Sequence, residues 1–249
     1  MRCIQPCKSW FSASYPDLSE IQKLALPHTL AGENTLILAA TGSGETFAAF
    51  LSVLSRLANC ASANTLSNAV CAIYVSPLKA LDNDIRRNLT PAWEAVNATL
   101  PASQQIRMEV RTGDTEQSAR SRQERRRPHL ILTTPESRSS ILSQSAWRET
   151  GFEPETVTVD EIHSFAEGKR GSLLALCLER LEQRAGRPVQ RIGVSATAWP
   201  IDAIQRLLCG KRACAVAKTD VRKSHHLEIV APEPEVCPRG SRRHDHHPV

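Results

Sequence analysis

The sequence predicts an α/β fold in which a mostly parallel β-sheet carries helices on both of its faces. Short apolar runs rich in β-branched residues alternate with longer segments of helical periodicity, as in strand–helix–strand units. The runs are also nearly continuous in apolar residues, which suits strands buried on both faces. With 249 residues, 41% hydrophobic and 23% charged, the chain is long enough for one sizeable globular domain.

Seven apolar runs and six periodic segments make up this alternation. The predicted strands are 35–39, 69–75, 106–111, 129–133, 156–160, 191–195 and 213–217. The predicted helices are 46–59, 78–98, 116–126, 136–144, 171–184 and 200–208. An open α/β sheet binds its ligands at the carboxyl ends of its strands, so the segments that follow the strands are where functional residues are expected.

The two ends of the chain differ in composition from the segment between them. Residues 1–10 are assigned to an N-terminal extension and residues 11–230 to a single folded domain. From residue 231 the chain is rich in proline, arginine and histidine and has almost no apolar periodicity. Such a segment buries too little apolar surface to offset its ordering entropy, which predicts a disordered tail over 231–249.

The composition bears on location and partners. The sequence has no run of about 18 or more apolar residues and no apolar stretch near its N-terminus, so it predicts neither a transmembrane helix nor a signal peptide. Its eight cysteines are scattered and none forms C-x-x-C, which favours free thiols in a reducing, cytoplasmic compartment over disulfides. The net charge of +5 permits nucleic-acid binding without requiring it.

The turn after the first predicted strand, residues 39–46, matches a phosphate-binding loop at all but one important position. In the pattern G-x-x-x-x-G-K-[ST], backbone N–H groups cradle the phosphates, the lysine reaches the β/γ-phosphates and the hydroxyl residue holds Mg²⁺. This chain has glutamate where the pattern has lysine. The loop residues predicted to contact a nucleotide are Thr41, Gly42, Ser43, Gly44, Glu45 and Thr46.

An acidic pair, Asp160 and Glu161, follows the apolar run VTV (157–159) at the end of the predicted strand 156–160. Downstream of a phosphate loop, such a pair suits hydrolysis of Mg·ATP, in which one carboxylate holds the metal ion and the other orients or deprotonates water. The sequence Ser195-Ala196-Thr197 ends the next predicted strand, and its hydroxyl groups could hydrogen-bond the acidic pair. A solvated strand-end turn is the alternative for the acidic pair, but the order of the motifs favours the functional interpretation.

In this order, the motifs resemble those of superfamily 2 helicases, and within them the first RecA-like domain of the large helicase-related (Lhr) family of DEAD/DEAH-type helicases. The resemblance extends from about residue 11 to residue 210. The segments that carry it are LSEIQ (18–22), LAATGSGETFAAFL (38–51), YVSPLKALDNDIRRNL (74–89), RTGDT (111–115), RRPHLILTTPES (126–137), VDEIHSFAEGKRGSLLALCLERL (159–181) and VSATAWPID (194–202). It implies a RecA-like P-loop NTPase domain that uses ATP and Mg²⁺.

The resemblance also implies roles for single residues. Gln22 would select adenine, because an amide offers both a donor and an acceptor. Thr46 and Asp160 would hold Mg²⁺, Glu161 would act as the base, and Ser195 and Thr197 would couple the nucleotide to domain movement. The residues that would contact the sugar-phosphate backbone of DNA or RNA are Ser76, Pro77, Lys79, Arg111, Gly113, Asp114, Thr134, Pro135 and Glu136.

Glu45 is the main departure from the family pattern. Two unit charges 4 Å apart interact with roughly 4 kcal/mol at an effective dielectric near 20, and reversing one sign changes the interaction by about twice that before relaxation and screening. The carboxylate could also rotate away from the phosphates or bind Mg²⁺. We therefore expect Glu45 to impair ATP binding.

The arginines between residues 120 and 127 form a strongly basic segment with a single opposing glutamate, Glu124. This segment could add salt-dependent affinity for nucleic acid, or it could be a solvated helix face, and the sequence favours neither.

The sequence after residue 210 is too short for the second RecA-like domain that a superfamily 2 motor needs to stabilise the transferring phosphoryl group. We therefore expect a truncated or frame-shifted copy that does not unwind a duplex alone, unless a second chain supplies that domain in trans. Two alternatives remain at this point: a catalytically inactive nucleic-acid-binding or interaction module, and a product that never folds stably.

Overall fold

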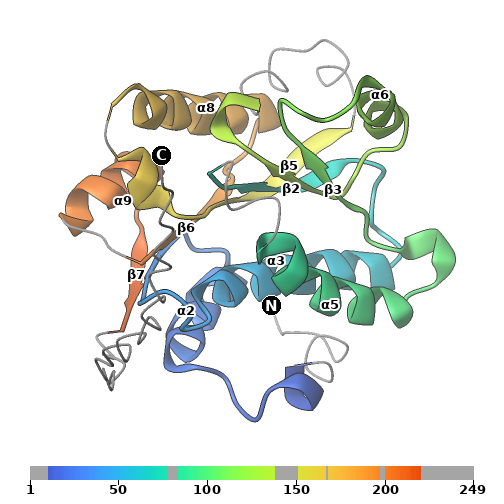
Figure 1. Cartoon of the computed structure of the whole chain (residues 1–249), viewed down its shortest axis with the longest axis horizontal. Helices are drawn as coiled ribbons and strands as arrows, with labels where there is room; N and C mark the ends of the chain where they lie inside the picture. Colours follow the sequence, from blue (N-terminus) through green and yellow to red (C-terminus); the bar gives the residue numbers. More distant parts are fainter. Residues whose placement is uncertain (1–10, 78–83, 138–150, 167, 197–199, 220–249) are drawn as a thin grey trace, which may run out of the picture.

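The computed structural model describes residues 11–77, 84–137, 151–166, 168–196 and 200–219. Seven strands form one sheet in the order β3-β4-β2-β5-β6-β1-β7, and every neighbouring pair is parallel (Figure 1). The strands are β1 (Thr35–Leu38), β2 (Val70–Val75), β3 (Met108–Arg111), β4 (Leu130–Thr133), β5 (Phe152–Val159), β6 (Gln190–Ser195) and β7 (Ala215–Lys218). The predicted α/β class and parallel sheet are confirmed.

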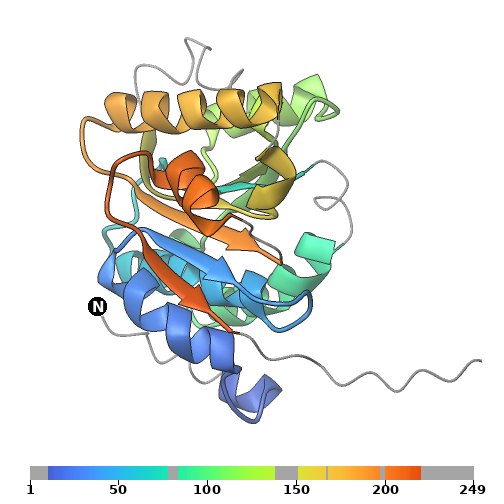
Figure 2. The same cartoon turned by 90° about the vertical axis from the view of Figure 1, so that its left-hand side faces the viewer.

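Helices cover both faces of the sheet (Figure 2). One face packs against α2 (Glu20–Ala31), α3 (Glu45–Ser62) and α5 (Asp84–Ala98), and the other against α8 (Lys169–Ala185) and α9 (Ile201–Cys209). Other described helices are α6 (Gln117–Arg125) and two 3₁₀ turns, η1 (Ala102–Gln104) and η3 (Ile162–Phe165), and residues 11–14 and 135–137 are also helical. No helix in the described part of the chain is long and apolar enough to cross a membrane.

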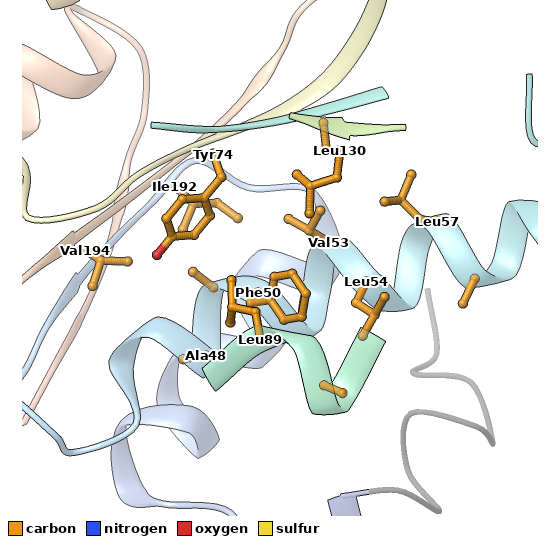
Figure 3. Packing of buried hydrophobic residues seen from close by; sticks show 14 of the residues in the cluster. Ala48, Phe50, Val53, Leu54, Leu57, Tyr74, Leu89, Leu130, Ile192 and Val194 are labelled. Carbon is orange, nitrogen blue, oxygen red and sulfur yellow. The ribbon is translucent and has the colours of Figure 1, made fainter. Parts of the chain in front are cut away.

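The apolar strand residues divide between two cores according to the two-residue period of a strand. In β2, Tyr74 faces the core against α3 and α5, while Ile73 and Val75 face the core against α8 and α9. In the first core, Phe50 of α3 is 1% exposed, and this helix lies under sheet residues such as Tyr74 (Figure 3). Full burial of such a side chain stabilises the fold by roughly 1.5–3 kcal/mol. A strand buried on both faces therefore shows a continuous apolar run.

The predicted elements that the structure describes agree with it to within a few residues, and α2 is the longest described element that was not predicted. Helix α2 was not among the predicted helices because Pro27 interrupts its pattern, and proline normally ends a helix. Ser19 nevertheless caps α2, and the backbone N–H of Ser19 donates to Gln22 Oε1 over 3.0 Å. Residues 78–83 of one predicted helix, most of the predicted helix 136–144, the N-terminal extension and the predicted tail lie outside the described residues.

The parallel register brings the carboxyl ends of the central strands to one edge of the sheet. Val75 of β2 pairs with Thr133 of β4 and Val159 of β5, and Leu38 of β1 pairs with Ser195 of β6. The loops that follow these strands therefore meet at this edge, here called the carboxyl edge. The described residues of the motifs that follow β1 to β6 therefore lie along this edge.

Candidate nucleotide site and nucleic-acid interface

The phosphate loop joins the end of β1 to the first turn of α3. Gly42 and Gly44 have φ angles of 74° and 94°, which L-residues with side chains rarely adopt, so glycine suits both positions. Gly44 is also the N-cap of α3, and a Cβ atom there would lie 2.5 Å from Gln22 Nε2. The loop thus has the backbone form that directs N–H groups toward an anion at a helix N-terminus.

The Glu45 side chain folds back into this loop. Its Oε1 accepts the N–H of Gly42 at 3.2 Å, and its Oε2 accepts the N–H of Ser43 at 3.0 Å and the Ser43 hydroxyl at 2.9 Å. Glu45 is only 8% exposed. The carboxylate therefore occupies donors of the kind that a phosphate would use, a contact that the charge argument from the sequence did not foresee.

Gln22, which was predicted to select adenine, lies beside the loop. Its Nε2 donates to the carbonyl of Gly44 at 3.2 Å, and its Oε1 accepts the Ser19 N–H. The residue is 6% exposed. Both ends of the amide are thus engaged within the protein, and Gln22 ties the start of α2 to the start of α3.

Asp160 follows β5 directly and is 6% exposed. Its Oδ2 accepts the Tyr74 hydroxyl at 2.6 Å, and its Oδ1 accepts the N–H of Glu161 at 2.9 Å. Burial raises the pKa of Asp160 to about 6; the Tyr74 hydrogen bond opposes this shift, and the charges of Glu161 and Glu45 add to it. A carboxyl group at this edge is therefore harder to ionise than an exposed one.

Tyr74 is a site residue that the sequence analysis assigned only to a strand and a motif. Its hydroxyl contacts both Asp160 and the side chain of Thr46, the two residues predicted to hold Mg²⁺. Burial and the neighbouring Asp160 raise its pKa well above the ordinary value. The sequence did offer a clue to this role, because Tyr74 stands in a strand predicted to be buried on both faces. A buried tyrosine hydroxyl needs a hydrogen-bond partner.

Glu161 is the start of a link between two motifs. It is one of two described non-glycine residues with positive φ, at 48°. His163 Nε2 lies 3.3 Å from Glu161 Oε2, and His163 Nδ1 lies 2.8 Å from Ser195 Oγ. His163 thus bridges Ser195 and Glu161, a residue of the acidic pair that Ser195 was expected to contact. Thr197 lies outside the described residues.

The candidate nucleic-acid residues follow β2 and β4. Ser76 is buried, and its N–H donates to the carbonyl of Thr133 at 3.0 Å. Pro77 is half-buried, Thr134 and Pro135 are buried, and Lys79 lies outside the described residues. Glu136 is exposed and pairs with Arg170 over 2.8 Å. Among the described candidates after β2 and β4, Glu136 is thus the one with an exposed side chain.

The side chain of Arg111 turns into the protein. Its guanidinium donates to Gln123 at 3.3 Å and to Glu124 at 3.2 Å, and the side chain is 4% exposed. The loop after it, with exposed Gly113 and Asp114, is held by Arg120, whose guanidinium donates to the carbonyls of residues 112, 113 and 115. The exposed candidates in this motif are Gly113 and Asp114.

The arginines of the basic segment, residues 120–127, fall into a buried or engaged group and an exposed group. Arg120 holds the loop described above and Arg127 is buried, so neither is a free surface charge. Arg122, Arg125 and Arg126 are exposed, and Arg122 pairs with Glu109 over 3.3 Å. Only the C-terminal end of α6 therefore presents arginines to solvent.

The backbone of the phosphate loop, Thr46 and Asp160 suit a nucleotide with Mg²⁺, but the placement of Glu45 does not. Thr46 and Asp160 supply a hydroxyl and a carboxylate, both hard oxygen ligands of the kind that Mg²⁺ prefers. In the described ranges, no group of three or more His, Cys, Asp or Glu residues is arranged to hold a metal ion by itself. A metal ion here would complete its coordination with oxygens from water or a bound phosphate.

A comparison with protein families matches residues 19–207 to the DEAD/DEAH box helicase model. The chain belongs to the DEAD/DEAH box helicase family. The matched range contains the phosphate loop, the acidic pair and Ser195, the three motifs on which the sequence-based assignment depended.

Curated relatives of this helicase domain carry the name Lhr. The chain is 40% identical over 91% of its length to the ATP-dependent helicase Lhr-Core of Methanothermobacter thermautotrophicus. It is 38% identical over 92% of its length to the Lhr helicase/probable uracil glycosylase of Mycolicibacterium smegmatis. The predicted resemblance to the Lhr family is confirmed. The chain spans 27% and 15% of the lengths of these relatives.

Solved structures agree with this family and with the RecA-like fold. Mycobacterium smegmatis helicase Lhr, bound to ssDNA and AMP-PNP, matches 87% of this chain with a TM-score of 0.78 and 38% identity; the match covers 28% of that chain. The DEAD-box helicase Mss116 matches 86% of this chain and 42% of its own, with a TM-score of 0.71 and 16% identity, which supports the fold alone.

Proposed function

We propose that this domain is the first RecA-like motor domain of an Lhr-like helicase, that it binds single-stranded nucleic acid, and that Glu45 impairs its ATP site. One observation carries the proposal: the phosphate loop, Thr46 and Asp160 meet Glu161 and Ser195 at the carboxyl edge of the sheet. Support also comes from the Lhr structure bound to ssDNA and AMP-PNP.

The residues divide between two ligands. For ATP, Gln22 would face the adenine, the loop 41–46 the phosphates, and Thr46 with Asp160 the Mg²⁺ ion. When bound, Mg²⁺ would supply positive charge that offsets the charge of the phosphates. Glu161 would hold the attacking water through its carboxylate, with His163 and Ser195 fixing its position, and Thr197 would extend this link. An arginine-bearing second domain, in the same assembly or in trans, would complete the site.

For nucleic acid, the proposed contacts are Ser76, Pro77, Lys79, Gly113, Asp114, Thr134, Pro135 and Glu136, together with the backbone around Arg111. Backbone N–H groups and helix N-termini bind phosphates without reading sequence, so DNA and RNA are both candidate ligands. The exposed arginines at the end of α6 lie toward the opposite, amino edge of the sheet, since α6 runs back from β3 to β4. They are left out of this proposed track.

Fluorescence anisotropy of labelled single-stranded DNA and RNA, at two salt concentrations, tests the nucleic-acid site. We expect affinity to fall steeply with salt, and Lys79→Ala to reduce the slope of log K against log salt by about one for a lost phosphate contact. Lys211→Ala is the matched control, because Lys211 is exposed before β7, at the amino edge. Failure of the wild-type protein to bind either strand would overturn the nucleic-acid assignment.

The ATP site is tested with AMP-PNP and the variant Glu45→Lys. We expect this variant to bind the analogue roughly tenfold or more tightly than the wild-type protein, because it restores a cation and removes an anion beside the phosphates. Isothermal calorimetry measures both affinities. Nucleic-acid binding that is unaffected by AMP-PNP in both proteins would favour the second candidate function, a nucleic-acid-binding module without ATP chemistry, which Glu45 also supports.

A further inference from the structure

The contacts of Glu45 indicate an effect on the phosphate loop beyond the absence of the family's lysine. In a phosphate loop the backbone N–H groups point at the ligand, and they stay available because the lysine side chain extends toward the same phosphates. Here the N–H groups of Gly42 and Ser43, and the hydroxyl of Ser43, all donate to a single carboxylate at 2.9–3.2 Å. Those donors are therefore already satisfied without any ligand.

A carboxylate is a good match for this position. It is an anion with two acceptor oxygens, and hydrogen bonds to an ionised acceptor are shorter and stronger than neutral ones. Glu45 also stands at the first position of α3, an 18-residue helix, where the helix dipole favours negative charge. The same two features make the loop attractive to a phosphate group, so the side chain and a nucleotide would use one set of donors.

We propose that Glu45 is an internal anion that closes the phosphate loop by competing with nucleotide phosphate for the N–H groups of Gly42 and Ser43. This inference rests on the proposed nucleotide site. It divides the effect of Glu45 into two parts, the loss of a positive charge and the occupation of the anion-binding donors. A nucleotide would have to displace the carboxylate, which would then remain close to the incoming phosphates.

Shortening the side chain separates the two parts. Glu45→Ala removes the competing anion without adding a cation, and Glu45→Gln keeps the length of the side chain but removes its charge. We expect Glu45→Ala to bind AMP-PNP about tenfold more tightly than the wild-type protein, Glu45→Gln to lie between them, and Glu45→Lys to bind most tightly. Calorimetry on the four proteins gives this order.

Inorganic pyrophosphate provides a second measurement that does not depend on the adenine site. We expect it to raise the melting temperature of Glu45→Ala but to leave that of the wild-type protein unchanged, because only the variant lacks the competing carboxylate. Glu20→Ala is the matched control, since Glu20 is an exposed acid in the first turn of α2. Far-UV circular dichroism confirms that each variant is folded, which matters because Glu45 is the first residue of α3.

The possible results separate this inference from the function on which it rests. If Glu45→Lys binds AMP-PNP while Glu45→Ala and Glu45→Gln match the wild-type protein, and pyrophosphate stabilises none of the three, the competition is overturned and the nucleotide site stands. If no variant binds AMP-PNP or pyrophosphate, both are overturned. Tighter binding by Glu45→Ala in either measurement supports the internal anion.

Discussion

Asp160→Asn is expected to stabilise the ligand-free domain, and to do so far more at pH 8 than at pH 4. The pKa of Asp160 in the folded protein is about 6, against an ordinary value of 3.8, because the carboxyl group is buried beside Glu161 and Glu45. A folded-state pKa above the unfolded one means that ionisation favours unfolding. Stability present below pH 3.8 is therefore lost as the pH rises through about 6. The full loss at pH 8 is at most about 3 kcal/mol, at about 1.4 kcal/mol per pKa unit.

Urea denaturation of the wild-type and Asp160→Asn proteins at pH 4, 6 and 8 measures this difference. The free energy of unfolding should rise in Asp160→Asn by less than about 1 kcal/mol at pH 4, and this increase should approach its maximum at pH 8. Asp202→Asn is the control, because it makes the same substitution at an exposed carboxyl group, in the first turn of α9. A variant that is less stable at every pH would mean that the hydrogen bond from Tyr74 outweighs the cost of burying the charge.

The loss of stability caused by ionising the buried Asp160 is expected of a site that binds a cation. A carboxylate held in a buried position without a cation destabilises the ligand-free protein, and a bound cation would remove that cost. Tyr74 limits the cost by donating to Asp160 while it also contacts Thr46. The arrangement thus holds both predicted metal ligands in place before any ligand arrives.

The fold could be predicted from the sequence because strands that are buried on both faces appear in it as continuous apolar runs. Ile73, Tyr74 and Val75 are consecutive and apolar, and the structure divides them between two cores. Loops after such strands then had to meet at one edge, which placed the phosphate loop, Asp160 and Ser195 together. Helix α2 escaped prediction because its stability comes from packing and capping, which outweigh the presence of Pro27.

Side-chain direction could not be predicted in the same way. The sequence places Arg111 in a family motif, but its guanidinium turns inward to Gln123 and Glu124, which only the packing of α6 on β3 decides. The sequence likewise reveals the charge of Glu45 but not its return to the loop, because that depends on the positive φ angles of Gly42 and Gly44. Residue identity gave the chemistry available at the site, and tertiary packing decided how it is used.

Gly171→Ala is expected to destabilise the domain by about 1–3 kcal/mol or more, the usual cost of forcing extra volume into a packed site. A Cβ atom at this position would lie 2.2 Å from the carbonyl oxygen of Phe165, which is backbone and cannot rotate away. Phe165 ends η3, the turn that contains His163. The clash would therefore push on the segment that links Glu161 to Ser195, so the variant tests whether α8 fixes that link.

Urea denaturation compares Gly171→Ala with Gly113→Ala, whose added Cβ atom would meet nothing within 4 Å. We expect the control to change the free energy of unfolding by no more than about 0.5 kcal/mol, as exposed substitutions usually do. Equal stabilities for the two variants would show that the backbone at Phe165 yields without cost. In that case η3 is not held by α8, and the position of His163 must depend on its contacts with Glu161 and Ser195 alone.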